Sequence, residues 1–273
     1  MIKRILPFLS LVLLMAAFHS CAKKEVIENQ GLDQSVLNRI QALGFSSEGA
    51  AVTEGGYLVE GDIVLTEQDL NNVFDIQSLI VGNAEQYRTT LLVTGLPRTI
   101  TVFINAGSGG GKLPASYGTA LDIAIARYNA EPLTLNFLRV FSSGAGDIDI
   151  VKGNGSYLAS AGFPTSGGDP FNSIKVNSNA IGNGSSSAFY NYLGSILAHE
   201  MGHCIGMRHT DYMDRSYSCG GGTANEGAST VGAINIPGTP TTADANSWML
   251  ACIGNLVDRP FNNNDKTALA YLY

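Results

Sequence analysis

The chain has 273 residues, which is enough for one large domain or for a domain with an N-terminal extension. Only 14% of the residues are charged and 32 are Gly, a composition typical of a loop-rich extracytoplasmic globular protein and unlike that of a disordered chain. The formal net charge is −7, and an acidic surface repels polyphosphate, so nucleic acid is excluded from the expected partners.

The N-terminus has the pattern of a targeting segment. Two basic residues precede an apolar run at 5–18, which is shorter than the about 20 residues of a membrane-spanning helix. A small residue, Ser20, then stands directly before Cys21, as in a bacterial lipoprotein signal. We therefore expect residues 1–20 to be a lipoprotein signal peptide, with Cys21 lipidated and the protein anchored to a membrane outside the cytoplasm. Plain secretion, with cleavage nearby, is the alternative.

Residues 21–90 are predicted to form a polar tether followed by a pro-segment or another N-terminal extension. Within this region, residues 35–43 have apolar side chains at helical spacing and predict a short amphipathic helix. Residues 57–65 follow a pair of glycines and are predicted to form a single strand. The rest of the chain, residues 91–273, is expected to form one further domain.

This further domain is predicted to be α+β, with a mixed sheet. Strand patterns occur at 99–105, 133–140 and 147–151, and a shorter one at 174–176 is bracketed by loop-forming residues, as an edge strand would be. A helix packed under the sheet is predicted from apolar residues three and four positions apart: Tyr117, Ala120, Leu121, Ala124, Ile125 and Tyr128.

Two more helices are expected in the second half of this domain. A long one opens at Ser187, and a last one begins at Asn262, with Asp265 placed favourably for the helix dipole. The intervening residues are irregular and rich in Gly and Pro. We expect them to form a small C-terminal subdomain, and we expect the functional cleft to lie between it and the sheet.

The long helix carries the pattern His-Glu-x-x-His-x-x-Gly-x-x-His, which begins at His199. His203 is four residues further on, so both imidazoles lie on one helix face and can reach one ion. Gly206 is placed where a helix can end in a left-handed conformation, and His209 then returns as a third ligand. Glu200 can point at a water held by the ion.

Three neutral imidazoles leave one coordination position open, which is the layout of a catalytic rather than a structural zinc site. The chain has only four histidines, and the fourth, His19, lies in the predicted signal peptide. We therefore predict Zn²⁺ as cofactor. A surface adhesin or binding lipoprotein with a structural metal is the alternative, but Glu200 argues against it, because a structural site has no need for that carboxylate.

The extended histidine motif is the signature of the metzincin metallopeptidases, and the chain resembles that clan. Their second hallmark is a turn with a Met beneath the metal, and the segment ending at Met249, forty residues past His209, resembles it. Within the clan, His199 to His203 are similar to the bacterial dual-action HEIGH metallopeptidase family. The resemblance covers roughly residues 95–273. It implies a metzincin-like fold, and a helper Tyr after the Met is missing or supplied by Tyr212 or Tyr217.

The resemblance also implies an activity. A zinc endopeptidase would hydrolyse peptide bonds of protein or peptide substrates by metal-activated water, with Glu200 as general base. A zinc amidase that acts on small substrates is a further alternative. We expect a monomer.

Three cysteines remain besides Cys21, an odd number for an oxidising compartment. A Cys219–Cys252 disulfide would fasten the loop under the metal to the Met-turn and leave Cys204 as a buried free thiol. A Cys204–Cys252 disulfide is the alternative. A thiolate zinc ligand is less favoured than either, because the histidines already complete a site.

The N-terminal region contains a further resemblance. Residues 59–63, Val-Glu-Gly-Asp-Ile, resemble the short Phe-x-Gly-Asp motif of astacin pro-segments, with Val59 in place of the aromatic residue. In that branch of the metzincins the Asp coordinates the zinc and displaces the catalytic water. This resemblance implies that Asp62 is a latency ligand and that activation requires cleavage between about Gly82 and Arg98. The same residues also fit a surface β-turn, where Gly-Asp pairs are common.

Overall fold

The structure is a computed structural model that describes residues 31–43, 45–71, 86–155, 157–221, 223, 225, 232–240 and 244–273. The predicted signal peptide, Cys21 and most of the tether lie outside the described residues. None of the helices in the described part of the chain combines the length and the apolar character that a membrane span requires.

The described residues before position 72 form a small N-terminal unit. Its elements are α1 (Gln34–Ala42), β1 (Ala51–Thr53), β2 (Gly56–Val59), β3 (Ile63–Leu65) and α2 (Glu67–Asn71). The three strands make an antiparallel sheet in the order β1-β2-β3. The predicted amphipathic helix is confirmed as α1, which Asp33 caps by accepting a hydrogen bond from the backbone N–H of Ser35.

The prediction of one strand over 57–65 was wrong, because the segment is a hairpin. Glu60 has a φ of 55° and Gly61 a φ of 93°, and these left-handed conformations reverse the chain between β2 and β3. Both arms, 57–59 and 63–65, are apolar like the halves of one strand, so the sequence pattern alone did not mark the turn. Asp62 consequently lies at the end of a tight turn.

A five-stranded mixed sheet forms the centre of the larger domain. Its strands are β5 (Arg98–Ile104), β6 (Leu135–Val140), β7 (Ile148–Lys152), β8 (Ala159–Ser160) and β9 (Ser173–Val176), in the order β6-β5-β7-β9-β8. All neighbours are parallel except β8 and β9. The prediction of an edge strand at 174–176 was wrong, because β8 pairs with β9 there, and a two-residue strand leaves no periodic signal in the sequence.

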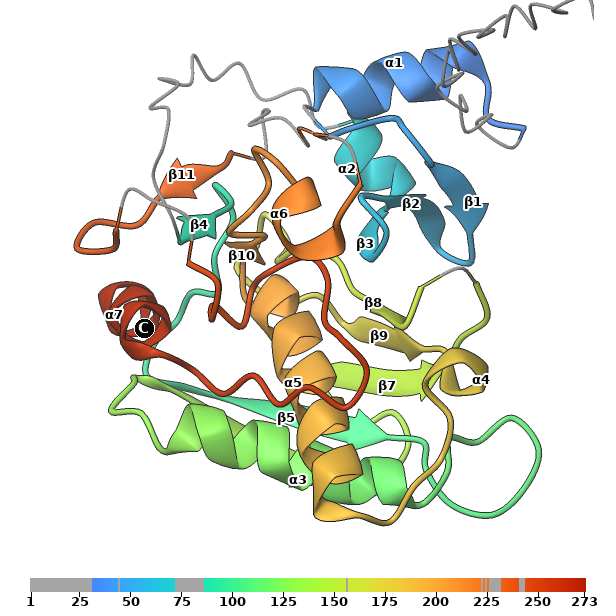
Figure 1. The fold of residues 1–273 in the computed structure, drawn as a ribbon, viewed down its shortest axis with the longest axis vertical. Coiled ribbons are helices and arrows are strands. Elements are labelled where there is room, and N and C mark those ends of the chain that lie inside the picture. The colour runs from blue at the N-terminus through green and yellow to red at the C-terminus, as the bar shows by residue number, and fades with distance from the viewer. Residues whose placement is uncertain are drawn as a thin grey trace, which may run out of the picture.

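The sheet shares one continuous apolar core with two long helices, α3 (Ser116–Asn129) and α5 (Ser187–Cys204). The helices pack against each other, and the Tyr128 hydroxyl of α3 donates a hydrogen bond of 2.8 Å to the Ala198 carbonyl of α5. Ser186 caps α5 by accepting from the backbone N–H of Phe189. Figure 1 shows α5 running from the end of the sheet toward the irregular half of the domain.

The remaining elements are short. They are β4 (Tyr87–Arg88), α4 (Ser178–Ile181), β10 (Met207–Arg208), α6 (Ser216–Cys219), β11 (Ile234–Asn235) and α7 (Asn263–Leu272). The strand β4, on the N-terminal side of the predicted boundary at residue 90, pairs with both β10 and β11. A capping box between Asn262 and Asp265 begins α7, as predicted. The predicted α+β fold class is confirmed.

Candidate metal centre

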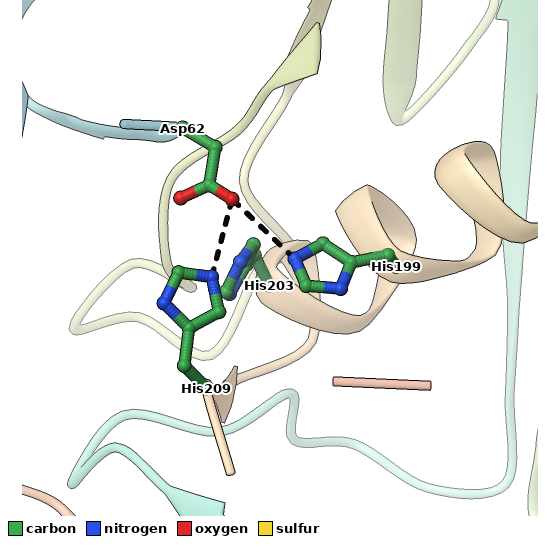
Figure 2. A group of neighbouring side chains, drawn as sticks. All are labelled: Asp62, His199, His203 and His209. Atoms are coloured by element: carbon green, nitrogen blue, oxygen red, sulfur yellow. Dashed lines mark hydrogen bonds and ion pairs between the residues drawn. The ribbon is translucent and has the colours of Figure 1, made fainter. Parts of the chain in front are cut away.

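The last two turns of α5 and the segment after it bring three histidines together (Figure 2). The ring centroids of His199 and His203 are 4.7 Å apart, and that of His209 lies 5.3 Å and 4.9 Å from them. Gly206 reverses the chain between helix and strand β10 with a φ of 105°. A Cβ at this position would lie 2.6 Å from the carbonyl oxygen of Leu91, so the close backbone approach requires glycine.

Backbone carbonyls orient two of the imidazoles. The Nδ1 atom of His199 lies 2.9 Å from the Trp248 carbonyl oxygen, and that of His203 lies 2.9 Å from the Met207 carbonyl oxygen. A carbonyl only accepts, so each Nδ1 carries the proton and each Nε2 has a free lone pair. Both Nε2 atoms are buried without a hydrogen-bond partner. Two orphaned imidazole lone pairs beside a third imidazole are the donor set that zinc prefers.

The electrostatics favour a neutral imidazole at His203. Burial, together with the neighbouring His199 and His209, holds the pKa of His203 well below its usual value. A histidine must be neutral to coordinate a metal, so this environment prepares the ring for binding.

Asp62 reaches the same centre from the N-terminal unit. Its Oδ2 atom lies 3.1 Å from Nε2 of His209 and 3.6 Å from Nε2 of His199 (Figure 2). One ligand atom from Asp62 and from each of the three histidines lie within 4.8 Å of one another. Burial opposes ionisation of Asp62, but the three histidines outweigh it and lower its pKa well below the usual value.

Two contacts hold this turn against the larger domain. The backbone N–H of Ala161 donates to the Asp62 carbonyl at 2.9 Å, and that of Val64 donates to the Ala161 carbonyl at 2.7 Å. The hairpin therefore runs alongside the β8 end of the sheet. Nearby, Arg208 donates to Glu60 at 2.9 Å, and both side chains are fully buried.

Glu200 lies beside the histidines and is only 3% exposed. Its Oε2 atom is buried without a hydrogen-bond partner, and it lines a cavity of about 220 Å³ together with His199 and Asp62. Burial, followed by the charge of Asp62, raises the pKa of Glu200 well above its usual value. A carboxyl group with a raised pKa in a cleft is suited to taking up and releasing a proton.

The segment that ends at Met249 passes under α5. Met249 is fully buried, and a Cβ added to Gly202 of the helix would lie 2.7 Å from its Sδ atom. The backbone N–H of Thr210 donates to the Met249 carbonyl at 2.9 Å, which ties this turn to the residue after His209. The turn thus supports the helix that carries two of the histidines.

Sequence reasoning missed the part that Asp265 plays here. Beyond capping α7, its buried carboxylate accepts from the Trp248 backbone N–H at 3.2 Å, and Trp248 in turn accepts from His199. Gln86 donates to the same carboxylate at 2.5 Å. Burial raises the pKa of Asp265 to about 6. The capping pattern placed Asp265 at a helix start, but no sequence signal linked it to His199.

Two of the cysteines are bonded to each other, and the two candidate helper tyrosines lie away from the cavity beside Glu200. Cys219 and Cys252 form a disulfide, and Cys204 is a buried free thiol. Tyr212 is buried and packs edge-on against Tyr87, with ring centroids 4.5 Å apart. Tyr217 is 46% exposed on α6. Neither tyrosine lines the cavity beside Glu200.

Comparison with known proteins gives one family. The model of the family described as dual-action HEIGH metallo-peptidase matches residues 57–273. No match was found among curated proteins. Two solved structures of myroilysin are similar to the chain. One has a TM-score of 0.32 at 17% identity, covering 45% of this chain and 54% of that chain; the other has a TM-score of 0.39 at 15% identity, covering 67% and 86%. The chain thus spans about half of the first myroilysin chain.

Proposed function

This chain belongs to the dual-action HEIGH metallo-peptidase family, as its histidine motif predicted, and we propose that it is a zinc endopeptidase acting on proteins or peptides. His199, His203 and His209 would hold the ion, and Glu200 would be the general base. The observation that carries this proposal is the convergence of two orphaned Nε2 atoms, those of His199 and His203, beside the cavity that the unpartnered Oε2 atom of Glu200 faces.

The arrangement of side chains accounts for the steps of hydrolysis. When bound, zinc acts as a Lewis acid that lowers the pKa of a coordinated water and polarises a carbonyl. Glu200 accepts the proton of the attacking water and passes it to the leaving amide nitrogen. The buried surroundings of Glu200 favour its protonated form and so favour this uptake. His199 keeps its orientation through Trp248, and His203 keeps its orientation through Met207.

The test compares two variants of the full chain that also carries Asp62→Ala. Glu200→Gln should retain zinc, measured by elemental analysis, and should lose casein-cleaving activity by roughly 10²–10⁴-fold, as expected when a general base is removed. His203→Ala should lose zinc and activity together. Activity equal to the parent protein in Glu200→Gln would contradict the mechanism, and full zinc occupancy in His203→Ala would contradict the ligand set.

An intact Glu200 also separates this function from the alternatives. A surface adhesin with a structural metal would bind its partner equally well as Glu200→Gln. A zinc amidase would hydrolyse small amides and leave casein intact. With a small amide assayed beside casein, an adhesin would hydrolyse neither substrate and an amidase only the small amide.

We also propose that the chain is latent, with Asp62 occupying the remaining ligand position. Its distances to His209 and His199 and the pairing of its turn with Ala161 support this role. The same carboxylate would exclude the catalytic water from the site. Cleavage between about Gly82 and Arg98 would then release the N-terminal unit, and with it the lipid anchor that we propose at Cys21.

Latency is tested with matched carboxylate variants of the full chain. Asp62→Ala should show cleavage activity before any processing, whereas Glu54→Ala should stay latent. Glu54 is an exposed carboxylate on the same unit, at the β1–β2 turn. Equal activity of the unprocessed wild type and Asp62→Ala would show that the N-terminal unit has another role, such as a spacer from the membrane.

The proposed location follows from the cysteines. A disulfide persists in oxidising compartments, so the Cys219–Cys252 pair supports a site outside the cytoplasm. Cys21→Ser should move the protein from the membrane fraction to the soluble extracytoplasmic fraction. Unchanged fractionation would contradict lipidation at Cys21.

A further inference from the structure

The cavity beside Glu200 is lined by an arginine that has no carboxylate partner among the described residues. Arg259 is half-buried, and its Nη1 atom donates to the Cys252 carbonyl at 3.0 Å. Its backbone N–H donates to the hydroxyl of Ser195, one turn before His199 on α5, at 2.8 Å. No ion pair involves its guanidinium in the described part of the chain. An arginine offers five N–H donors, so most of them remain for a ligand.

Two other arginines of the chain, unlike Arg259, form ion pairs with carboxylates. Arg127 pairs with Asp258 at 2.6 Å, and Arg208 pairs with Glu60 at 2.9 Å. Asp258 is adjacent to Arg259 in the chain, yet its carboxylate is taken by Arg127 and Ser195. Burial lowers the pKa of Arg259, although the charges of Asp211 and Asp265 oppose this shift.

The walls around Arg259 are apolar and firmly held. They are formed by Leu158, Ala159, Ile196, Leu250 and Ile253. The segment after Met249 is fastened by three bonds: Asp211 accepts from the Ala251 backbone N–H at 2.9 Å, Ser218 accepts from the Cys252 backbone N–H at 3.0 Å, and the disulfide joins Cys252 to α6. A charge in such a preformed, apolar setting interacts strongly with an opposite charge.

Apart from Glu200, the acidic side chains that line the cavity already have partners. Glu60 is engaged with Arg208, and Asp62 is engaged with the histidines. Both belong to the hairpin that occupies the cleft. Beyond the general base Glu200, the ionisable groups that the larger domain contributes away from the metal centre are Arg215, Arg259 and Tyr157.

We propose that Arg259 determines substrate specificity, and that the cavity takes an acidic side chain, Asp or Glu, of the residue next to the cleaved bond. The carboxylate would meet the free edge of the guanidinium, and the methylene groups of the side chain would pack against the apolar walls. This inference rests on the proposed function, because it places the cleaved bond beside Glu200.

The first test uses a peptide library and the full chain carrying Asp62→Ala. Cleavage sites should be enriched in Asp and Glu at one position flanking the bond. Arg259→Met should reduce that preference roughly 10- to 100-fold, the range expected for charge-assisted hydrogen bonds. Arg259→Lys should keep part of it. The control is Arg139→Met, which removes an arginine on β6 paired with Asp122 and should leave the preference unchanged.

The second test measures binding without cleavage. A fluorescent peptide with Glu at the preferred position and its Gln counterpart are titrated onto the Asp62→Ala, Glu200→Gln chain, with and without Arg259→Met. Tighter binding of the Glu peptide that depends on Arg259 supports the inference even if no peptide is cleaved, in which case only the proposed function fails. Cleavage with no acidic preference, or a preference that survives Arg259→Met, overturns the inference and leaves the proposed function standing.

Discussion

Two regions face each other across the cleft, and they are held in different ways. On one side, His199 and His203 lie on a helix inside the large apolar core, and backbone carbonyls fix both rings. On the other side, Asp62 lies on a turn that contacts the larger domain through two backbone hydrogen bonds to Ala161 and a buried ion pair at Glu60. The N-terminal unit has its own small core, to which the larger domain adds Phe163.

This difference indicates which of the two regions can detach without unfolding the other. Removing the histidine side would open the main core, whereas removing the hairpin opens two smaller apolar clusters, which contain Phe163 and Tyr157 of the larger domain. Elements with few apolar contacts open at lower free energy than the rest of a protein. The packing of the two regions therefore fits a metal centre whose histidines stay in place while Asp62, the proposed fourth ligand, is removed.

The largest effect is expected from removing the ion pair between Arg208 and Glu60, which joins the two regions. Arg208→Met breaks the buried ion pair between Arg208 and Glu60, and breaking such a pair costs about 3–5 kcal/mol of unfolding free energy. Urea denaturation of the full chain measures this. Adding Glu60→Gln to Arg208→Met should recover part of the loss, because the buried charge of Glu60 disappears. A single variant as stable as wild type would mean that the hairpin is held by other contacts.

The next prediction concerns the disulfide between Cys219 and Cys252, which fastens the wall of the cleft beside Arg259. Replacing Cys219 and Cys252 together by Ser should lower the unfolding free energy by roughly 3–4 kcal/mol on the chain-entropy model. Adding a reductant to the wild type should have the same effect, and Cys204→Ser should not reproduce it. Thermal unfolding measured with and without reductant provides the comparison. A reductant-insensitive wild type would show that the bond does not contribute.

The support under the histidine helix is tested by adding one methyl group. Gly202→Ala places a Cβ against Met249 and the Trp248 ring, and overpacking of this kind costs about 1–3 kcal/mol. Because the strain falls under His199 and His203, zinc affinity should fall as well. Gly110→Ala is the matched control, since nothing lies within 4 Å of the added atom. Equal stability and zinc affinity of both variants would contradict the tight packing described.

The smallest expected effect concerns the cap of α7. Asn262→Ala removes the side chain that accepts from the backbone N–H groups of Asn264 and Asp265, which costs about 1 kcal/mol. The loss should appear in thermal unfolding, with zinc content unchanged, because Asp265 keeps its own bond to Trp248. Loss of zinc in this variant would place the cap in the support of the metal centre.

Much of the histidine side follows from local rules. The spacing of His199 and His203, the helix end at Gly206 and the helix-start pattern at Asn262 each depend on residues a few positions apart. The strands of the central sheet and α3 were predicted for the same reason, since a periodic pattern reports burial of one face. Where the pattern was too short, as in β8, or ran unbroken through a turn, as at Glu60 and Gly61, local reasoning failed.

The sequence by itself determined that His199, Glu200 and His203 share one helix end, because helical geometry acts over four residues and needs no partner. Only the tertiary structure decided what meets them. Asp62 reaches the histidines from far along the chain, Asp265 supports His199 through Trp248, and Arg259 lines the cavity without an ion pair to any described residue. Long-range packing creates these contacts, and the spacing of residues along a chain holds no record of which distant side chains are buried together.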